Sequence, residues 1–160
     1  MVIIKIIFHI KAIIKKFFLK IIFGKKIKFG KKVTWRKNFM VAISNGKIEI
    51  GDGVFFNNNC SLSSDEMITI GKHCIFGENV KIYDNNHIFK KNELIKAQGL
   101  KSEPIIIGDN NWIANNVCIL KGARIGDNCV IGAGCVIDKE IPSNSLVKNT
   151  QNIQIQEIRR

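Results

Sequence analysis

An apolar residue returns at every sixth position over the last third of the chain, and this period limits the fold more than any other feature. Six isoleucines keep the register without a slip: Ile107, Ile113, Ile119, Ile125, Ile131 and Ile137. A period of six fits neither the 3.6-residue turn of an α-helix nor the alternation of an unbroken strand. It fits short strands joined by bends, each pointing its apolar side chain into a triangular prism. Three such strands close one coil of roughly eighteen residues.

The same frame occurs earlier in the chain. Two further triplets repeat it, and a degenerate one precedes them: Ile50, Phe56 and Leu62; Ile70, Phe76 and Ile82; Phe29, Trp35 and Val41. We therefore predict an all-β domain over residues 27–150, folded as a parallel β-helix of about five coils. Glycine often follows the aliphatic residue, and we expect it to supply a positive φ at the corners.

The five cysteines follow this frame. Cys60, Cys74, Cys129 and Cys135 fall four places after the recurring apolar residue, at a small inward position where a thiol packs as a compact hydrophobe. Cys118 lies one place out of that series. No pair has the C-x-x-C spacing of a zinc site, the number is odd, and the three histidines do not resemble a zinc ligand set. We therefore expect no metal and a reduced, cytoplasmic protein.

The positive charge is concentrated at one end. Residues 1–37 hold 12 Lys and Arg and no acidic residue, and the rest of the chain holds 13 basic and 13 acidic residues, so the net charge of +12 comes from the arm. A basic terminal arm on a neutral body favours a membrane surface. We expect no nucleic-acid partner, because the aromatic residues are not interleaved with base-contacting ones.

Residues 3–23 predict an amphipathic helix within an N-terminal segment 1–26. At 100° per residue, half of the circumference is apolar and the other half is polar. The polar half consists of Lys5, His9, Lys11, Lys15, Lys16 and Lys20. These lysines interrupt every stretch that could span a bilayer. Two roles stay open: a helix in the headgroup region of an anionic membrane, or a helix packing its apolar face across the end of the β-helix. Residues 151–160 are expected to form a C-terminal tail.

The repeat is lost between Tyr83 and Pro104, where the chain is polar and charged. Long excursions from a regular solenoid tend to carry function. His87 falls where the chain leaves the prism, and we expect the following loop, residues 88–103, to contribute to the choice of acceptor.

The pattern resembles the hexapeptide-repeat acyltransferases, and within them the sugar O-acetyltransferases of the maltose and capsule type. The resemblance covers about residues 29–150 and rests on four stretches: NNNCSLSS (57–64), IGKHCIFGENVKIYDNNHIF (70–89), PIIIGDNNWIANNVCILKGARIGDNCVIGAGCVI (104–137) and IPSNSLV (141–147). It implies a left-handed helix, a homotrimer with active sites between subunits, and acetyl-CoA as donor.

The resemblance also implies catalytic residues. His87 matches the family's histidine that takes the proton of a sugar hydroxyl, which suits a side chain whose ordinary pKa is near 6.5. Asp84 either orients that imidazole or caps the corner as a turn residue. Family members often carry histidine where this chain has Asn85, and the oxyanion donor is either the Asn85 amide or a backbone N–H.

For the donor, the resemblance places the pantetheine arm in a groove between subunits. Ala114, Gly132 and Ala133 match positions where small residues let a thin ligand approach. Trp112 either walls this groove or is a packing residue. Two lysines, Lys139 and Lys148, either bind the CoA phosphates or are merely solvated. After IPSNSLV the chain continues as KNTQNIQ, which departs from the family's usual run.

The resemblance thus implies an acetyl-CoA-dependent O-acetyltransferase that modifies a sugar hydroxyl, and we expect a role in surface polysaccharide biosynthesis. We expect it in the cytoplasm or at the inner face of the cytoplasmic membrane. Two alternatives stay open: an N-acetyltransferase acting on an amino sugar, and a non-catalytic β-helical scaffold.

Overall fold

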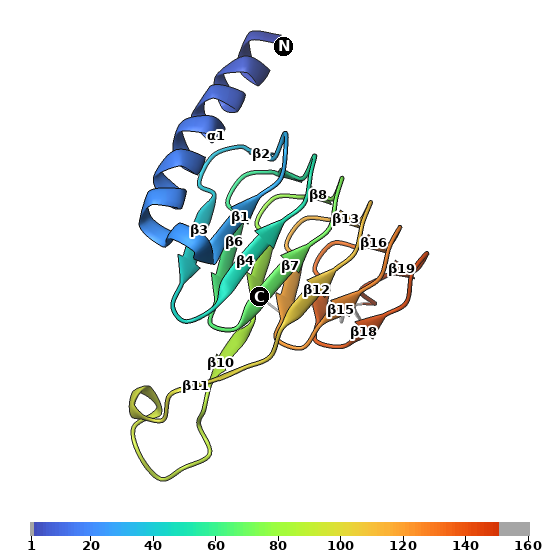
Figure 1. Ribbon diagram of the computed structural model, residues 1–160. Helices are drawn as coiled ribbons and strands as arrows, with labels where there is room; N and C mark the ends of the chain where they lie inside the picture. Colours follow the sequence, from blue (N-terminus) through green and yellow to red (C-terminus); the bar gives the residue numbers. More distant parts are fainter. Residues whose placement is uncertain (1, 151–160) are drawn as a thin grey trace, which may run out of the picture.

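The computed structural model describes residues 2–150, with side chains from Phe8 onward, so the expected tail 151–160 lies outside the described residues. The chain begins with helix α1 (Val2–Phe23) and a 3₁₀ turn (Gly24–Lys26), and then winds into a prism (Figure 1). The predicted N-terminal helix is therefore present, and the β-structure begins at Ile27.

The prism has three walls of parallel strands. Wall A consists of β1 (Ile27–Phe29), β4 (Lys47–Ile50), β7 (Met67–Ile70), β12 (Ile105–Ile107), β15 (Arg124–Ile125) and β18 (Glu140–Ile141). Wall B consists of β2 (Thr34–Trp35), β5 (Phe55–Phe56), β8 (Ile75–Phe76), β13 (Trp112–Ile113), β16 (Val130–Ile131) and β19 (Leu146–Val147). Wall C consists of β3 (Met40–Ile43), β6 (Ser61–Ser64), β9 (Lys81–Tyr83), β14 (Cys118–Leu120) and β17 (Val136–Ile137). Five coils are complete and a sixth has begun, which confirms the predicted left-handed parallel β-helix.

The recurring apolar residues form the core, as predicted. In wall A, Ile70 pairs with Ile50 on one side and Ile107 on the other, and all three are nearly inaccessible to solvent. Wall B contributes a column of aromatic rings: Phe56 lies 4.7 Å from Phe39 and 4.6 Å from Phe76, measured between ring centroids. Apolar burial of this kind is the main source of stability in a solenoid.

The cysteines occupy the predicted places. The four inward thiols, those of Cys60, Cys74, Cys129 and Cys135, are buried, whereas Cys118 is half-buried on wall C. Burial raises the pKa of Cys74 to about 11, so this thiol stays protonated at neutral pH. These cysteines therefore pack as small core residues.

The corners differ from the prediction. The glycine after the aliphatic residue does not have a positive φ; that conformation occurs two residues later, usually at asparagine, for example Asn79 (φ 60°) and Asn116 (φ 59°). Asparagine tolerates the left-handed region, and here the Asn79 amide also donates to Asn116 Oδ1 at 2.8 Å. Glycine serves close stacking instead: a Cβ on Gly108 would lie 2.8 Å from the Gly126 carbonyl carbon.

Helix α1 lies across the N-terminal end of the prism. Ala12 and Leu19 are buried against the first coil, and the Lys15 ammonium donates to the carbonyl of Phe39. The Lys16 ammonium lies 5.9 Å from the centroid of the Trp35 ring, a cation–π contact. Burial is the main cause of the lowered pKa of both lysines. The helix thus caps the prism, but not with its apolar face, which was one of the two roles left open.

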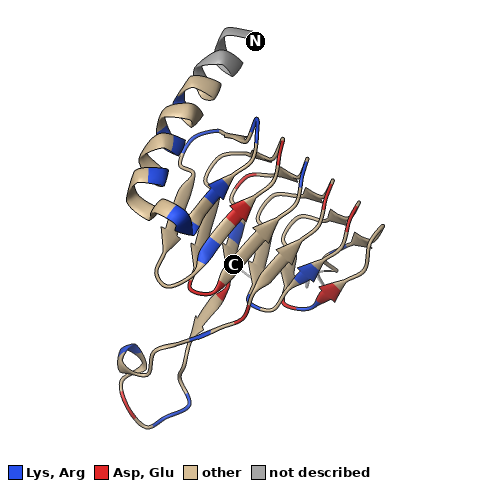
Figure 2. Cartoon of the chain, viewed as in Figure 1, with Lys and Arg blue, Asp and Glu red and all other residues tan. Residues whose placement is uncertain are grey.

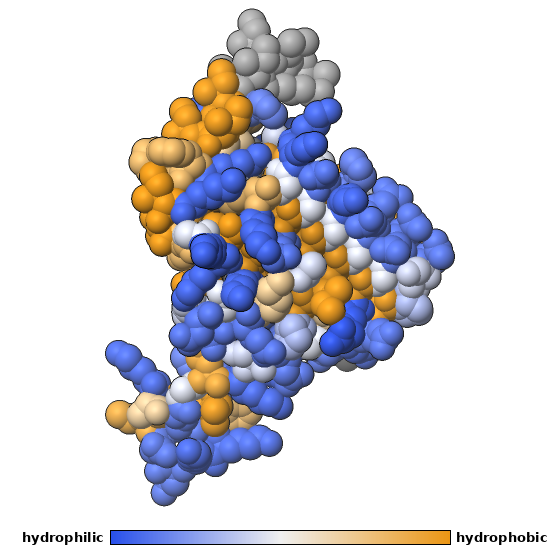
Figure 3. Space-filling view, viewed as in Figure 1, coloured by the Kyte–Doolittle hydropathy of each residue, from blue (hydrophilic) through white to orange (hydrophobic). Residues whose placement is uncertain are grey.

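The apolar face of α1 points outward instead. Its side chains are more than half exposed: Ile10, Ile13, Ile14, Phe17, Phe18, Ile21 and Ile22. Figure 3 shows them as a hydrophobic ridge along the outer side of the helix. Lysines recur along the coloured part of α1, whereas acidic and basic residues both occur on the prism (Figure 2). No helix in residues 2–150 is long and apolar enough to cross a membrane.

Candidate active site

The predicted interruption of the repeat is an ordered hairpin. Strands β10 (Asn85–His87) and β11 (Leu100–Ser102) pair antiparallel and project from the corner between walls C and A (Figure 1). At its foot, the Glu103 amide donates to the Asp84 carbonyl at 3.0 Å, and the Glu103 carboxylate pairs with Lys121 at 2.6 Å. Hydrogen bonding from Lys121, and then from Lys101, lowers the pKa of the Glu103 carboxyl.

Asp84 is the buried carboxylate at this corner. It is inaccessible to solvent and accepts hydrogen bonds from the Ser64 hydroxyl (2.7 Å), the Asp65 amide (2.7 Å), the Glu66 amide (3.0 Å) and the Asn85 side-chain amide (3.0 Å). None of its partners in the described part of the chain is His87. Of the two roles left open for Asp84, the observed bonds are those of a corner cap.

A groove of about 440 Å³ lies beside His87, between the hairpin and wall C. Its lining combines hydroxyl, amide and apolar groups, and the His87 side chain is exposed at its edge. The Tyr83 and Ser61 hydroxyls are 2.9 Å apart on the floor of the groove. The groove therefore offers a candidate base next to several groups able to hydrogen-bond a polyol.

Three groove residues, Ser61, Ser63 and Tyr83, were not among the predicted site residues. The signal was present, because residues that flank an inward position on a strand point outward. Leu62 and Ile82 are inward, so their neighbours on β6 and β9 had to line the outer face of wall C next to the exit of the hairpin.

Most of the predicted donor-binding residues gather at the edge of wall B. Ala114, Gly132 and Lys148 follow successive strands and stack in adjacent coils, since the Ala114 amide donates to Ile131 and the Gly132 amide to Val147. Ala133 continues the same turn. A Cβ on Gly132 would lie 2.9 Å from the Val147 carbonyl oxygen, so the small residue is required by the stacking itself.

The two remaining predicted residues lie at different places. Trp112 stands 54% exposed on the outer face of wall B, so it is not a core residue. Lys139 lies at another corner, between walls C and A, where its carbonyl accepts the Arg124 amide at 3.3 Å. The structure thus separates Lys139 from Lys148, although both are exposed.

Within residues 2–150, no three His, Cys, Asp or Glu side chains gather in a way that could hold a metal ion.

Known proteins share this repeat and its sequence. Residues 104–139 match the family model of the bacterial transferase hexapeptide (six repeats). The galactoside O-acetyltransferase of Escherichia coli strain K12 is 38% identical over 111 residues, which are 69% of this chain and 54% of that protein. The chain belongs to the hexapeptide-repeat transferase family.

Two further proteins are similar to this hexapeptide-repeat chain. The Escherichia coli protein WbbJ, whose name assigns it to lipopolysaccharide biosynthesis as an O-acetyl transferase, is 32% identical over 66% of the chain and 58% of its own length. A hexapeptide-repeat acetyltransferase from Vibrio cholerae, solved with acetyl coenzyme A, is 29% identical with a TM-score of 0.69, over 82% of this chain and 70% of that one. The chain spans about half the length of the curated relatives it matches first.

Proposed function

We propose that this chain is an acetyl-CoA-dependent O-acetyltransferase acting on a hydroxyl group of a sugar. The observation that carries the proposal is the exposed imidazole of His87 at the edge of the wall C groove, in a hexapeptide-repeat chain with O-acetyltransferase relatives. A scaffold would have no use for an exposed base held beside a groove that is lined with hydroxyl groups.

His87 is the proposed general base. As the sugar oxygen attacks the thioester carbonyl, the imidazole takes the hydroxyl proton, and it returns that proton to the departing thiolate of CoA. Ser61, Ser63 and Tyr83 are placed to hydrogen-bond the other hydroxyl groups of the acceptor. Asp84 acts through position: its bonds to the Ser64–Glu66 turn fix the point where the strand carrying His87 leaves the prism.

The developing oxyanion needs a donor that does not have to reorganise. The Asn85 side chain lines the groove, and its amide nitrogen already donates to Asp84 at 3.0 Å. One of its two N–H groups is therefore occupied and holds the other in a fixed direction. Asn85 serves as that donor, or a backbone N–H of the hairpin does so.

The donor is proposed to lie along the ladder of Ala114, Gly132 and Ala133, with Trp112 as its wall and Lys148 near the phosphates. Lys139, at the corner between walls C and A, lies away from this ladder and is not assigned to it. In line with the family resemblance, the proposed assembly is a homotrimer with sites between subunits. WbbJ supports a role in surface polysaccharide biosynthesis. The proposed place of action is the cytoplasm, with peripheral attachment to the membrane through residues 3–23.

Thiol release from acetyl-CoA, measured against a panel of sugars, sugar nucleotides and amino sugars, tests the proposal. His87→Ala should lower turnover by roughly 10²–10⁴-fold, the usual contribution of a general base. His9→Ala is the matched control, because His9 is exposed on α1 away from the groove, and it should leave turnover unchanged.

Turnover of amino sugars alone, with a small deficit in His87→Ala, would identify an N-acetyltransferase, since an amine with a lowered pKa depends less on a base. No turnover with any acceptor, together with no binding of CoA, would leave the scaffold.

A further inference from the structure

We propose that α1 docks the chain on an anionic phospholipid bilayer through its outer face, and that this geometry selects a membrane-anchored glycan as acceptor. The docking stands on the described helix alone. The part concerning the acceptor rests on the proposed O-acetyltransferase function and names the class of its substrate.

The first observation is that one side of the helix packs on the prism while the other side is exposed. The inner side is already occupied: Ala12 and Leu19 are buried, and Lys15 is bonded to the first coil. The outer side has Ile10, Phe17 and Ile21 in one line, each more than half exposed, with Ile13 and Ile14 beside them. A cap needs only the inner side, so the apolar outer side requires a different explanation. Contiguous exposed apolar surface of this kind marks an interaction site.

The second observation is the charge beside this ridge. At 100° per residue, the exposed Lys11 and Lys20 lie roughly 90° to either side of the line through Ile10 and Phe17. Lysines at the rims of an apolar face are placed to meet phosphate headgroups while the apolar side chains enter the acyl boundary. Each lysine near an anionic leaflet strengthens binding by roughly fivefold.

The charge also argues against a second copy of the chain as the occupant. Residues 1–37 carry 12 basic and no acidic side chains, so two ridges packed face to face would bring two strongly positive arms together. Like charges opposed at an interface are unfavourable. An anionic bilayer supplies the missing negative charge and the apolar phase together.

The fold then fixes the height of the groove above the lipid. Helix α1 packs on the first coil, whereas His87 follows β9, the last strand of the third coil. Two coil spacings of about 4.8 Å and one helix thickness of about 10 Å place His87 roughly 20 Å from the bilayer surface. A single sugar attached directly to a lipid headgroup would not reach that height, but a longer glycan on the same lipid would.

Co-sedimentation of the full chain with vesicles tests the docking. We expect binding to vesicles of phosphatidylglycerol and phosphatidylcholine, and much weaker binding to phosphatidylcholine alone. The double variant Phe17→Ser, Ile21→Ser should bind the anionic vesicles at least about 100-fold more weakly, because it removes two large apolar side chains from the contact. Leu146→Ser is the matched control. This exposed apolar residue lies at the opposite end of the prism, so its substitution should leave vesicle binding unchanged.

Two results would overturn the docking. One is unchanged vesicle binding by the double variant while its far-UV spectrum and unfolding midpoint match wild type. The other is a decrease in oligomer size in the double variant, seen by sedimentation velocity, with no vesicle binding by either protein; that outcome would assign the ridge to a second copy.

The acceptor class has its own test. Two acceptors, a single sugar and a glycan of several sugars, are anchored in the vesicles by the same lipid. For each acceptor, the rate of acetylation on the vesicle is divided by the rate for the same glycan in solution. We expect membrane anchoring to favour the longer glycan, and equal ratios would overturn the height argument. A double variant that retains wild-type turnover of soluble acceptors would show that the enzyme and the docking are separable. Vesicle binding without turnover of any acceptor would instead remove the proposed function and leave the docking.

Discussion

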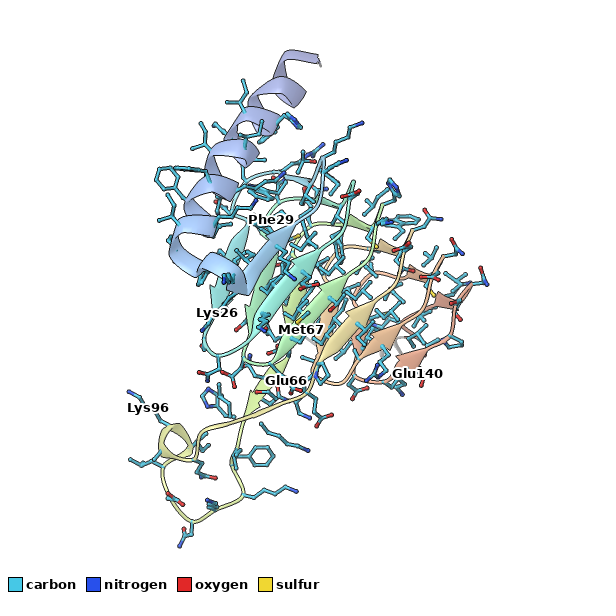
Figure 4. The ribbon with its side chains drawn as sticks, in the orientation of Figure 1. Lys26, Phe29, Glu66, Met67, Lys96 and Glu140 are labelled. Carbon is cyan, nitrogen blue, oxygen red and sulfur yellow. The ribbon has the colours of Figure 1, made fainter. Side chains whose placement is uncertain are left out.

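The coils between Ile105 and Val147 and the hairpin between Asn85 and Ser102 lie next to each other and are built on opposite principles. In the coils, each inward side chain has a like neighbour above and below, as Ile113 does with Phe76 and Ile131. In the hairpin, apolar side chains such as Phe89 and Leu94 are exposed, the latter by 80%. Figure 4 shows Lys96 at the end of the hairpin, pointing away from the prism.

This difference separates stability from chemistry. Stability is distributed over ladders in which no residue has a unique partner, whereas the hairpin depends on a few polar contacts at its foot and around Gln98. Substitutions in the coils should therefore change unfolding. Substitutions in the hairpin should change the placement of His87 and leave most of the unfolding free energy intact.

The largest effect is expected inside the aromatic column. Phe56→Ala removes a fully buried ring between Phe39 and Phe76 and should lower the free energy of unfolding by about 3–5 kcal/mol. Leu94→Ala, in the hairpin, should change it by no more than about 0.5 kcal/mol. Urea unfolding followed by circular dichroism measures both. A similar loss in the two variants would contradict the separation.

Asp84 is where the two regions join, and its substitution should affect both. Asp84→Ala leaves the amides of Asp65 and Glu66 without their acceptor, which should cost about 3 kcal/mol and also lower turnover. Asp84→Asn distinguishes the two roles. If Asp84 caps the corner, stability and turnover fall together while the pH profile of kcat/KM keeps its shape. If it orients the imidazole, stability holds and the profile shifts.

The ladders could be predicted because they depend on one residue in six. The left-handed corners could have been predicted from the same frame, since Asn59, Asn79 and Asn116 each stand three places after an inward residue. The network at Asp84 could not. The network forms because the Ser64–Glu66 turn of the preceding coil lies next to Asp84, where the hairpin leaves the prism. The coils differ in length, so the six-residue period does not predict which turns become neighbours.

The orientation of α1 could not be predicted from the sequence either. An amphipathic pattern favours an apolar inner face, but the first coil has no coil beneath it, so its backbone carbonyls need donors. The Lys15 ammonium supplies one from the helix, at Phe39, and Lys26, in the 3₁₀ turn after the helix, donates to Ser44. The polar side of the helix therefore faces the prism.

A smaller effect is expected from pH, and it concerns the coils alone. Burial raises the pKa of Cys74 from 9.0 to about 11, so the folded chain holds this proton more tightly than the unfolded chain does. The resulting stabilisation is complete below about pH 9 and is lost as pH rises toward 11. The unfolding midpoint of wild type should consequently fall more steeply over this range than that of Cys74→Ala. Parallel curves for the two proteins would contradict a buried, protonated thiol.

The smallest effect on global stability, and the most local one, is expected at Gln98. Its buried side chain accepts the Lys91 amide at 3.1 Å and donates to the carbonyls of Lys91 and Glu93, so it organises the hairpin from within. Gln98→Ala should change the free energy of global unfolding by less than about 1 kcal/mol, because no wall of the prism uses these bonds.

Hydrogen exchange measures the local consequence of that substitution. Amides of the hairpin in Gln98→Ala should exchange faster than in wild type, while those of β13 and β16 keep their protection. Lys96→Ala, an exposed change in the same hairpin, is the control and should leave both sets as they are. Faster exchange in the walls as well would mean that hairpin and prism unfold as one unit. In that case the hairpin could not be tuned for an acceptor without a cost to the fold.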